Sequence, residues 1–277
     1  MTRRVPLLAL VLAFVLAAAP GAHAQEEPGA TAPSPSQIAA AKEYFKERTG
    51  RRAFAVVDSE GQLSGVSVHA RFVTASVVKA MLLVEYLRTL ERQDRARSPA
   101  DRNLLGSMIR ESSNAAATAI YRRIGDAGLR RLAARTGMED FVIGPGWLKS
   151  CRCRAGLWAR AQLSAADQAR FFWDMDRFIP TRFRAFARNL LETVVASQSW
   201  GIPAAARPFG WQVFFKIGLR STGLGALIHQ SARLEQNGQR IGLAVLTDGD
   251  PTYAYGMATV RGVGQRIVGP TGPVARR

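Results

Sequence analysis

The chain is poor in cysteine, histidine and lysine, with two, three and five of them among 277 residues. Cys151 and Cys153 are too few to hold zinc alone, and His69 and His229 lie far from them in the sequence. We therefore expect no metal ion and no other cofactor. The spacing of the thiols leaves three states open: a strained disulfide, an intermolecular bridge, or two free thiols.

Acidic residues are also scarce, because 21 Asp and Glu stand against 38 Lys and Arg, a formal net charge of +17. A protein with this excess is attracted to anionic surfaces, and an anionic cell wall is one such partner. The arginines are scattered and form no nucleic-acid-binding motif with aromatic residues, so we expect no nucleic-acid partner. The sequence does not define the oligomeric state, and a monomer is the working expectation.

The N-terminal residues have the three parts of a secretory signal peptide. Arg3 and Arg4 precede an apolar stretch at residues 7–19, and an Ala-x-Ala cleavage site ends at Ala24. Residues 1–24 are therefore predicted to be removed, which makes the mature protein secreted, either periplasmic or extracellular. The apolar stretch is shorter than the roughly 20 residues of a membrane-spanning helix. The export route, Sec or twin-arginine, stays open.

Strand patterns occur at both ends of the folded region, and helical patterns occur between them. Residues 25–36 are rich in Pro, Ala and Ser and are predicted to be a disordered linker, and residues 269–277 a flexible tail. The domain is then expected at residues 37–268, with a helical insertion at about 85–205. This distribution predicts an α+β fold, in which an antiparallel sheet built from the N- and C-terminal segments carries an inserted all-α lobe.

The periodicity of apolar residues places the individual elements. The expected strands cover residues 53–57, 65–68, 211–217, 225–236 and 240–247, and Asn237-Gly238 predicts a tight hairpin between the last two. The expected helices cover residues 37–49, 74–90, 101–111, 114–124, 126–136, 164–175, 181–198 and 254–267. Residues 140–162 are irregular, which is long for a structureless connection and indicates a functional or Ω-type loop.

Ser76 and Lys79 form the only S-x-x-K motif of the chain, at the start of a helix that is apolar on almost every side. Three residues are just under one helical turn, so the hydroxyl and the amine share a face. The positive end of the helix and burial favour the neutral form of Lys79, and a neutral amine can take the proton of Ser76. The alternative is a lysine whose stem packs in the core while its amine reaches solvent.

Two further short motifs contain reactive or ligand-binding side chains. Ser112 and Asn114 stand in Ser-Ser-Asn between two helices, where a hydroxyl can relay a proton and a carboxamide can bind a substrate amide. Lys216 and Gly218 stand in Lys-Ile-Gly at the expected end of a strand, where the amine can bind a carboxylate and the glycine admits a ligand backbone. Taken alone, the Ser-Ser-Asn motif also fits a helix cap, and the lysine of Lys-Ile-Gly also fits a charge that protects an edge strand.

The order of the motifs, S-x-x-K, S-x-N and K-x-G, resembles that of the penicillin-recognising serine hydrolases, the superfamily of class A β-lactamases and penicillin-binding D,D-peptidases. The resemblance extends over about residues 37–268 and includes Gly-Met-Ala-Thr-Val in the closing helix. Residues 165–172 and 199–203 are similar to a divergent branch of exported serine hydrolases. The resemblance implies a serine acyl-transfer hydrolase, acylated by β-lactams or by D-Ala-D-Ala-like amides of the cell wall.

The same resemblance assigns a role to each motif residue. Ser76 would be the acylated nucleophile, Lys79 its general base, Ser112 the proton shuttle and Lys216 the cation beside the substrate carboxylate. The oxyanion hole would consist of the backbone N–H groups of Ser76 and Leu219. The substrate-binding residues would be Asn114, Gly218, Leu219 and Arg220.

The sequence departs from the family pattern at two places. Residues 145–163, which would contain the glutamate that activates the deacylating water, hold no Asp or Glu. Because removing a general base lowers the rate of the step it assists by about 10²–10⁴-fold, we expect an acyl-enzyme that deacylates slowly. Ile217 stands where a Thr or Ser hydroxyl would bind the substrate carboxylate, and Arg220 could replace part of that contact.

Two other functions remain open. One is a peptidoglycan D,D-peptidase or esterase whose acceptor is water or an amine, and the other is a non-catalytic relative that binds the cell wall. The five tryptophans, all between Trp147 and Trp211, fit core packing or, for the binder, platforms that stack on sugars. The natural substrate does not follow from the motifs.

Overall fold

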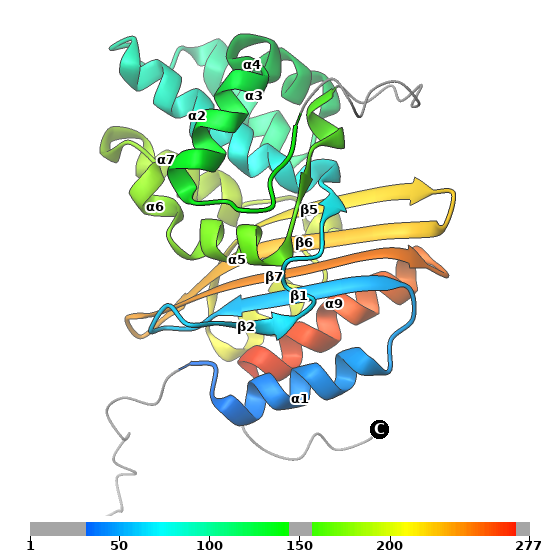
Figure 1. Ribbon diagram of the computed structural model, residues 1–277. Coiled ribbons are helices and arrows are strands. Elements are labelled where there is room, and N and C mark those ends of the chain that lie inside the picture. The colour runs from blue at the N-terminus through cyan, green and yellow to red at the C-terminus, as the bar shows by residue number, and fades with distance from the viewer. Residues whose placement is uncertain (1–31, 144–156, 270–277) are drawn as a thin grey trace, which may run out of the picture. The chain divides into compact units, whose positions relative to one another are not determined.

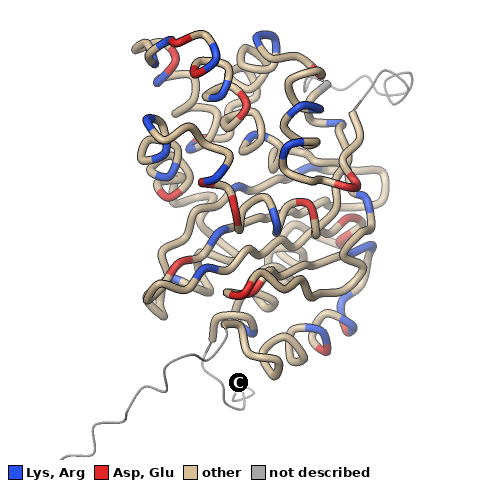
Figure 2. Tube along the Cα trace, turned by 60° about the vertical axis from the view of Figure 1, so that its left-hand side comes forward, with Lys and Arg blue, Asp and Glu red and all other residues tan. Residues whose placement is uncertain are grey.

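The computed structural model describes residues 32–143 and 157–269 (Figure 1). The predicted signal peptide 1–24, Cys151 and Cys153 lie outside the described residues, as do most of the predicted linker and tail. Lys and Arg are spread over the helices and the strands rather than gathered at one place (Figure 2). Within the described ranges, no helix is both long enough and apolar enough to cross a membrane.

Five antiparallel strands form the main sheet, in the order β2-β1-β7-β6-β5. The strands are β1 (Arg51–Val57), β2 (Leu63–Val66), β5 (Gln212–Thr222), β6 (Gly225–Gln236) and β7 (Gln239–Asp250). The N-terminal strands join the C-terminal strands where β1 pairs with β7. The sheet is therefore assembled from both ends of the chain, which confirms the predicted α+β architecture. A separate pair contains β3 (Phe72–Val73) and β4 (Gln162–Leu163).

Helices cover both faces of the main sheet (Figure 1). On one face, α1 (Pro35–Lys46) and α9 (Tyr253–Val268) lie side by side. On the other face, α5 (Ala165–Trp173) lies against the strands, next to the inserted helical lobe. The lobe contains α2 (Lys79–Arg92), α3 (Pro99–Arg110), α4 (Asn114–Thr136), α6 (Met175–Phe178) and α7 (Thr181–Glu192). The short helix α8 (Ile202–Ala206) leads back to the sheet.

Strand alternation divides the core into two apolar clusters. In β1, Ala53 and Ala55 belong to the cluster shared with the lobe, whereas Phe54 and Val56 belong to the cluster shared with α1 and α9. Successive side chains of a strand point to opposite faces, so one short apolar run fills both clusters. The S-x-x-K helix α2 is buried in the lobe cluster over most of its length, as its apolar sequence predicts.

Local sequence determines where several elements begin and turn. Ser34 caps α1 through the N–H of Gln37, so the helix begins at Pro35 and the predicted linker ends earlier than residue 36. Asn237 and Gly238 have φ values of 49° and 78°, the left-handed pair that a two-residue hairpin turn requires. The predicted break between two helices falls inside α4 at Gly125, where φ is 63°.

Candidate active site

Ser76 lies in a 3-10 turn, η1 (Ala75–Val78), which leads directly into α2. The prediction of a regular α-helix from residue 74 is therefore wrong in its first turn. In a 3-10 turn, side chains three residues apart eclipse each other, so Ser76 and Lys79 leave the backbone on the same side. The preceding Ala75 has a φ of 45°, a left-handed conformation that is strained for a residue with a Cβ.

Lys79 is completely buried, and its amine contacts the second motif. The Nζ atom donates to the Ser112 carbonyl at 2.5 Å, to Asn114 Oδ1 at 2.8 Å and to Ser112 Oγ at 3.1 Å. Burial lowers the pKa of Lys79 to about 7, because the ammonium form loses its hydration. The alternative interpretation, in which the amine reaches solvent, is contradicted.

Ser112 is available to the site because its neighbour caps the following helix. Ser113 Oγ accepts the N–H of Ala116 at 3.2 Å and so fills the N-cap position of α4. Ser112 has a φ of 59°, a second left-handed residue beside the cavity. Its hydroxyl lies between two lysine amines.

Lys216 reaches the same hydroxyl from the sheet. Its Nζ donates to Ser112 Oγ at 3.0 Å, and its side chain is completely buried. Burial, together with the charge of Lys79, holds the pKa of Lys216 well below that of a free lysine. Lys216 lies in the middle of β5, which continues to Thr222, and not at a strand end as predicted.

The third motif brings the edge of the sheet against the nucleophile. A Cβ on Gly218 would lie 3.1 Å from the backbone nitrogen of Ser76 and 3.2 Å from the Ala75 Cβ, so a side chain here would crowd the strand and the 3-10 turn. The Ile217 side chain is 3% exposed and packs in the apolar cluster shared with α1 and α9. Packing therefore accounts for an aliphatic residue at this position.

A cavity of about 190 Å³ lies beside Ser76. Asn114, Leu219 and Arg220, three of the predicted substrate-binding residues, line it together with Ser76. The other predicted residues are Lys79 and Lys216, which both contact the Ser112 hydroxyl, Ser112 itself, and Gly218, which packs against Ser76. The structure therefore brings all of the predicted site residues together.

Trp158 is a site residue that the sequence reasoning did not identify. It lies in η3 (Leu157–Arg160), lines the cavity and is completely buried, with its ring centroid 5.1 Å from Lys79 Nζ. Its indole N–H donates to Thr118 Oγ1 at 3.2 Å, and its carbonyl accepts from Thr74 Oγ1 at 3.3 Å. The available signal was its place in the irregular segment 140–162, but core packing explained a tryptophan there equally well.

The acidic residues nearest this loop in the sequence have other partners. Asp167 Oδ1 accepts the N–H of Glu139 at 3.0 Å, and its Oδ2 accepts the N–H of Ser164 at 3.3 Å. Asp140 lies 2.9 Å from Nδ1 of His69. Among the described residues that line the cavity, none is acidic.

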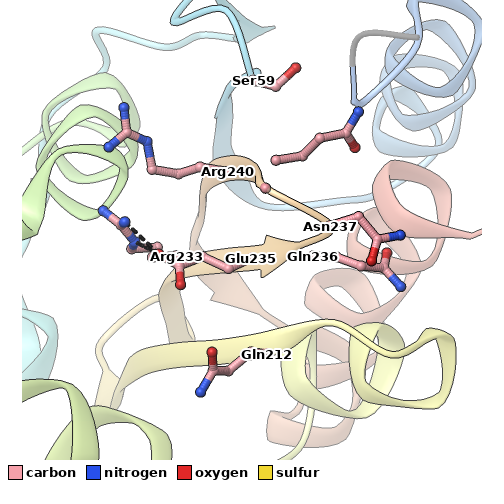
Figure 3. Close-up of a pocket in the computed structure, with 9 residues that line it drawn as sticks. Ser59, Gln212, Arg233, Glu235, Gln236, Asn237 and Arg240 are labelled. Atoms are coloured by element: carbon pink, nitrogen blue, oxygen red, sulfur yellow. Dashed lines mark hydrogen bonds and ion pairs between the residues drawn. The ribbon is translucent and has the colours of Figure 1, made fainter. Parts of the chain in front are cut away.

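A larger hollow of about 550 Å³ lies at the turn between β6 and β7 (Figure 3). Arg233 and Glu235 line it and pair with each other, and none of the predicted site residues is among its lining. These charges are already compensated within the protein. We therefore place the candidate active site at Ser76.

The sequence matches the model of a family described as the beta-lactamase enzyme family over residues 101–269. That segment includes the second and third motifs, whereas Ser76 and Lys79 precede it. No curated protein has a sequence that matches this chain.

Solved structures of class A beta-lactamases are similar to this chain. An ancestral class A beta-lactamase is 19% identical, with 84% of this chain and 98% of that one covered and a TM-score of 0.69. The enzyme from Mycobacterium abscessus is 18% identical, with 83% and 97% covered and a TM-score of 0.68. A beta-lactamase from Sphaerobacter thermophilus is 17% identical, with 83% and 95% covered and a TM-score of 0.69. At these identities the likeness shows the fold, which is that of class A beta-lactamases.

Proposed function

The chain belongs to the beta-lactamase enzyme family, and from that premise we propose that it is a serine acyl-transfer hydrolase with Ser76 as nucleophile. One observation supports the proposal above all. Two buried lysines, Lys79 and Lys216, meet at the Ser112 hydroxyl beside the cavity that Ser76 lines. No carboxylate among the described residues pairs with either amine, and such an arrangement costs stability, so a chemical role explains it best.

In the proposed acylation step, neutral Lys79 takes the proton of Ser76 Oγ, which attacks the carbonyl carbon of the substrate amide. The backbone N–H groups of Ser76 and Leu219 stabilise the oxyanion. Ser112 then passes a proton from Lys79 to the leaving nitrogen as the C–N bond breaks, which leaves an ester on Ser76. The 3.1 Å between Lys79 Nζ and Ser112 Oγ is short enough for this transfer.

The proposed substrates are β-lactams or D-Ala-D-Ala-like amides of the cell wall. Both carry a carboxylate near the amide that reacts. Arg220 on the cavity wall supplies positive charge for it, and Lys216, whose pKa burial lowers in the free protein, becomes a second cation when a substrate carboxylate lies beside it. Arg220 lines the cavity and replaces the hydroxyl contact that Ile217 does not offer. Asn114 binds the amide on the acyl side of the substrate. Export by means of the predicted signal peptide 1–24 would bring the protein to the cell wall.

We also propose that deacylation is slow. Trp158 presents an apolar ring to Lys79 from the loop side, where hydrolysis requires a group that activates water. An indole ring is not a base, and residues 145–163 contain no carboxylate. The ester on Ser76 therefore persists until water reacts slowly or an amine accepts the acyl group, as in a D,D-peptidase.

Labelling with a fluorescent penicillin, followed by intact-mass measurement, tests the proposal. We expect one covalent adduct on the protein, none on Ser76→Ala, and normal labelling of Ser36→Ala, which changes an exposed serine on α1. Fast hydrolysis of a chromogenic cephalosporin would contradict slow deacylation. Absence of an adduct, with cell-wall binding that survives Ser76→Ala, would contradict catalysis and favour the non-catalytic binder.

A further inference from the structure

A third cavity, also of about 550 Å³ but distinct from the hollow at the β6–β7 turn, lies away from Ser76 and is rich in arginine. Four helices each contribute one arginine to its lining: Arg88 from α2, Arg135 from α4, Arg170 from α5 and Arg177 from α6. Arg88 is nine residues beyond Lys79 on α2, which is about 13 Å along a helix. No residue lines both this cavity and the one beside Ser76.

Carboxylates do not balance the charge of this arginine cavity. Asp174 is the one acidic residue among its lining residues, so the lining carries 4 − 1 = +3. Asp174 lies 3.6 Å from Arg177, and Glu139, outside the lining, lies 3.9 Å from Arg170. Both separations exceed those of charge-assisted hydrogen bonds. Arg88 and Arg135 have no carboxylate within ion-pair distance in the described part of the chain.

The protein holds one of these cations in place despite the repulsion. Arg88 Nη1 donates to the Phe178 carbonyl at 2.9 Å, which fixes its guanidinium at the cavity wall. Burial and the charge of Arg135 both lower the pKa of Arg88. Like charges that face a common space repel each other, and an anion between them would relieve the repulsion.

We propose that the arginine cavity binds a diphosphate group. Guanidinium groups bind phosphate oxygens in pairs through two N–H donors each. One phosphate monoester carries about −1.5 to −2 at neutral pH, so two linked phosphates match a lining charge of +3 better than one. The diphosphate belongs to a soluble molecule or to a lipid headgroup, which present the same chemistry. This binding is independent of acyl transfer at Ser76.

Isothermal titration of the full chain with inorganic pyrophosphate in 0.15 M NaCl tests the proposal. We expect saturable binding of one equivalent. Arg135→Gln should raise the Kd at least about tenfold, because it removes a charge-assisted contact, and Arg88→Lys, which keeps the charge, should raise it less. The control Arg261→Gln removes an exposed arginine of α9, on the other face of the sheet, and should leave the Kd unchanged.

A second arm uses farnesyl diphosphate in phosphatidylcholine vesicles and distinguishes the two sources of the ligand. Binding of inorganic pyrophosphate supports a soluble ligand. A lipid headgroup is supported if the protein does not bind free pyrophosphate but sediments with the vesicles that carry farnesyl diphosphate, and if Arg135→Gln abolishes that sedimentation. If Arg135→Gln and Arg261→Gln weaken diphosphate binding equally, the binding is a general effect of charge and the proposal is overturned. Absence of binding in both arms would overturn it as well. Penicillin labelling of Ser76 should be the same in Arg135→Gln as in the unmodified protein.

Discussion

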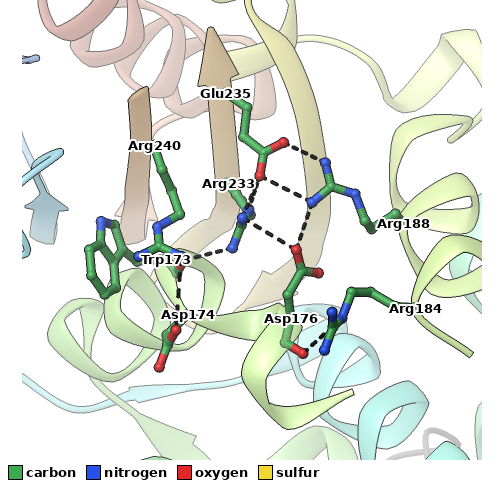
Figure 4. Close-up of polar contacts among 8 residues, drawn as sticks. All are labelled: Trp173, Asp174, Asp176, Arg184, Arg188, Arg233, Glu235 and Arg240. Carbon is green, nitrogen blue, oxygen red and sulfur yellow. Dashed lines mark hydrogen bonds and ion pairs between the residues drawn. The ribbon is translucent and has the colours of Figure 1, made fainter. Parts of the chain in front are cut away.

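Two polar clusters lie against the same face of the sheet and differ in how their charge is compensated. The lysine cluster consists of Lys79, Ser112 and Lys216, and contains two amines and a hydroxyl but no carboxylate. The arginine cluster consists of Arg188, Arg233, Asp176 and Glu235 (Figure 4). The lysine cluster meets the sheet at Lys216 of β5, and the arginine cluster meets it at Arg233 and Glu235 of the neighbouring strand β6. Alternate residues of a strand share a face, which places both clusters on the side of the lobe.

Every charged group of the arginine cluster has a partner of opposite charge. Asp176 Oδ2 lies 2.7 Å from Arg188 Nη1 and 3.3 Å from Arg233 Nη2, and Glu235 pairs with both arginines. Burial alone would raise the pKa of Glu235, but the hydrogen bonds and charges of these arginines outweigh it and lower that pKa. The cluster joins β6 to α6 and α7 through these ion pairs.

The difference shows how one sheet face serves two purposes. A buried arginine stays protonated, and a carboxylate beside it offsets the charge, so the pair connects elements of the fold. A buried lysine without a carboxylate loses its proton more easily and becomes a base. The arginine cluster is therefore structural, and the lysine cluster is suited to chemistry.

The largest expected effect is on the lysine cluster. Lys79→Arg keeps a positive charge, but a guanidinium does not release its proton, so penicillin labelling of Ser76 should slow by at least about 10³-fold. The labelling rate is measured by stopping the reaction with fluorescent penicillin at set times and reading the fluorescence bound to the protein. Lys46→Arg, a change at an exposed lysine on α1, is the control. Labelling of Lys79→Arg at the unmodified rate would show that Lys79 is not the base.

The arginine cluster should respond in stability and not in chemistry. Glu235→Gln removes the charge that compensates Arg188 and Arg233, so the free energy of unfolding should fall by about 3 kcal/mol. Urea denaturation measures it, and Glu43→Gln, in an exposed pair on α1, should change it by less than about 0.5 kcal/mol. The labelling rate per folded molecule should be unchanged. A large loss of labelling instead would mean that the two clusters are not separable.

A smaller effect is expected from the ring that shields the lysine cluster. Trp158→Ala should admit water beside Lys79 and shorten the lifetime of the acyl-enzyme about tenfold, less than the 10²–10⁴-fold that a positioned base supplies. Release of the fluorescent adduct over time measures this lifetime. Trp158→Phe keeps an apolar ring and should release the adduct slowly. If the acyl-enzyme has the same lifetime in the unmodified protein, Trp158→Ala and Trp158→Phe, then Trp158 is not the cause of slow deacylation.

The most gradual effect is a dependence of stability on pH. Because the pKa of Lys79 falls from 10.5 to about 7 on folding, the folded protein binds fewer protons than the unfolded chain between these values. The free energy of unfolding should therefore rise with pH across this window, by at most about 1.4 kcal/mol per unit from this group. Urea denaturation at pH 7 and 9 measures the rise, and Lys79→Met should reduce it. The labelling rate should fall as pH drops below 7, because Lys79 becomes protonated.

The strand alternation, the helical insertion and the Asn237-Gly238 turn could be predicted because each depends on residues that are close in sequence. The role of Ser112 was predicted only from the order of the three motifs, because Ser-Ser-Asn by itself also fits a helix cap. The structure shows that Ser113 fills the cap by accepting from Ala116. Trp158 was missed for a related reason. Its contact with Lys79 joins positions that are far apart in the chain, and no local pattern encodes it.

By itself, the sequence determined which reactive groups exist and their spacing, because side chains within one turn of backbone have their relative positions set by local geometry. Only the tertiary structure decided which of the buried cations have a carboxylate to offset their charge. That compensation depends on what distant segments place around each side chain: carboxylates beside Arg188 and Arg233, and only a hydroxyl, an amide and an indole ring beside Lys79.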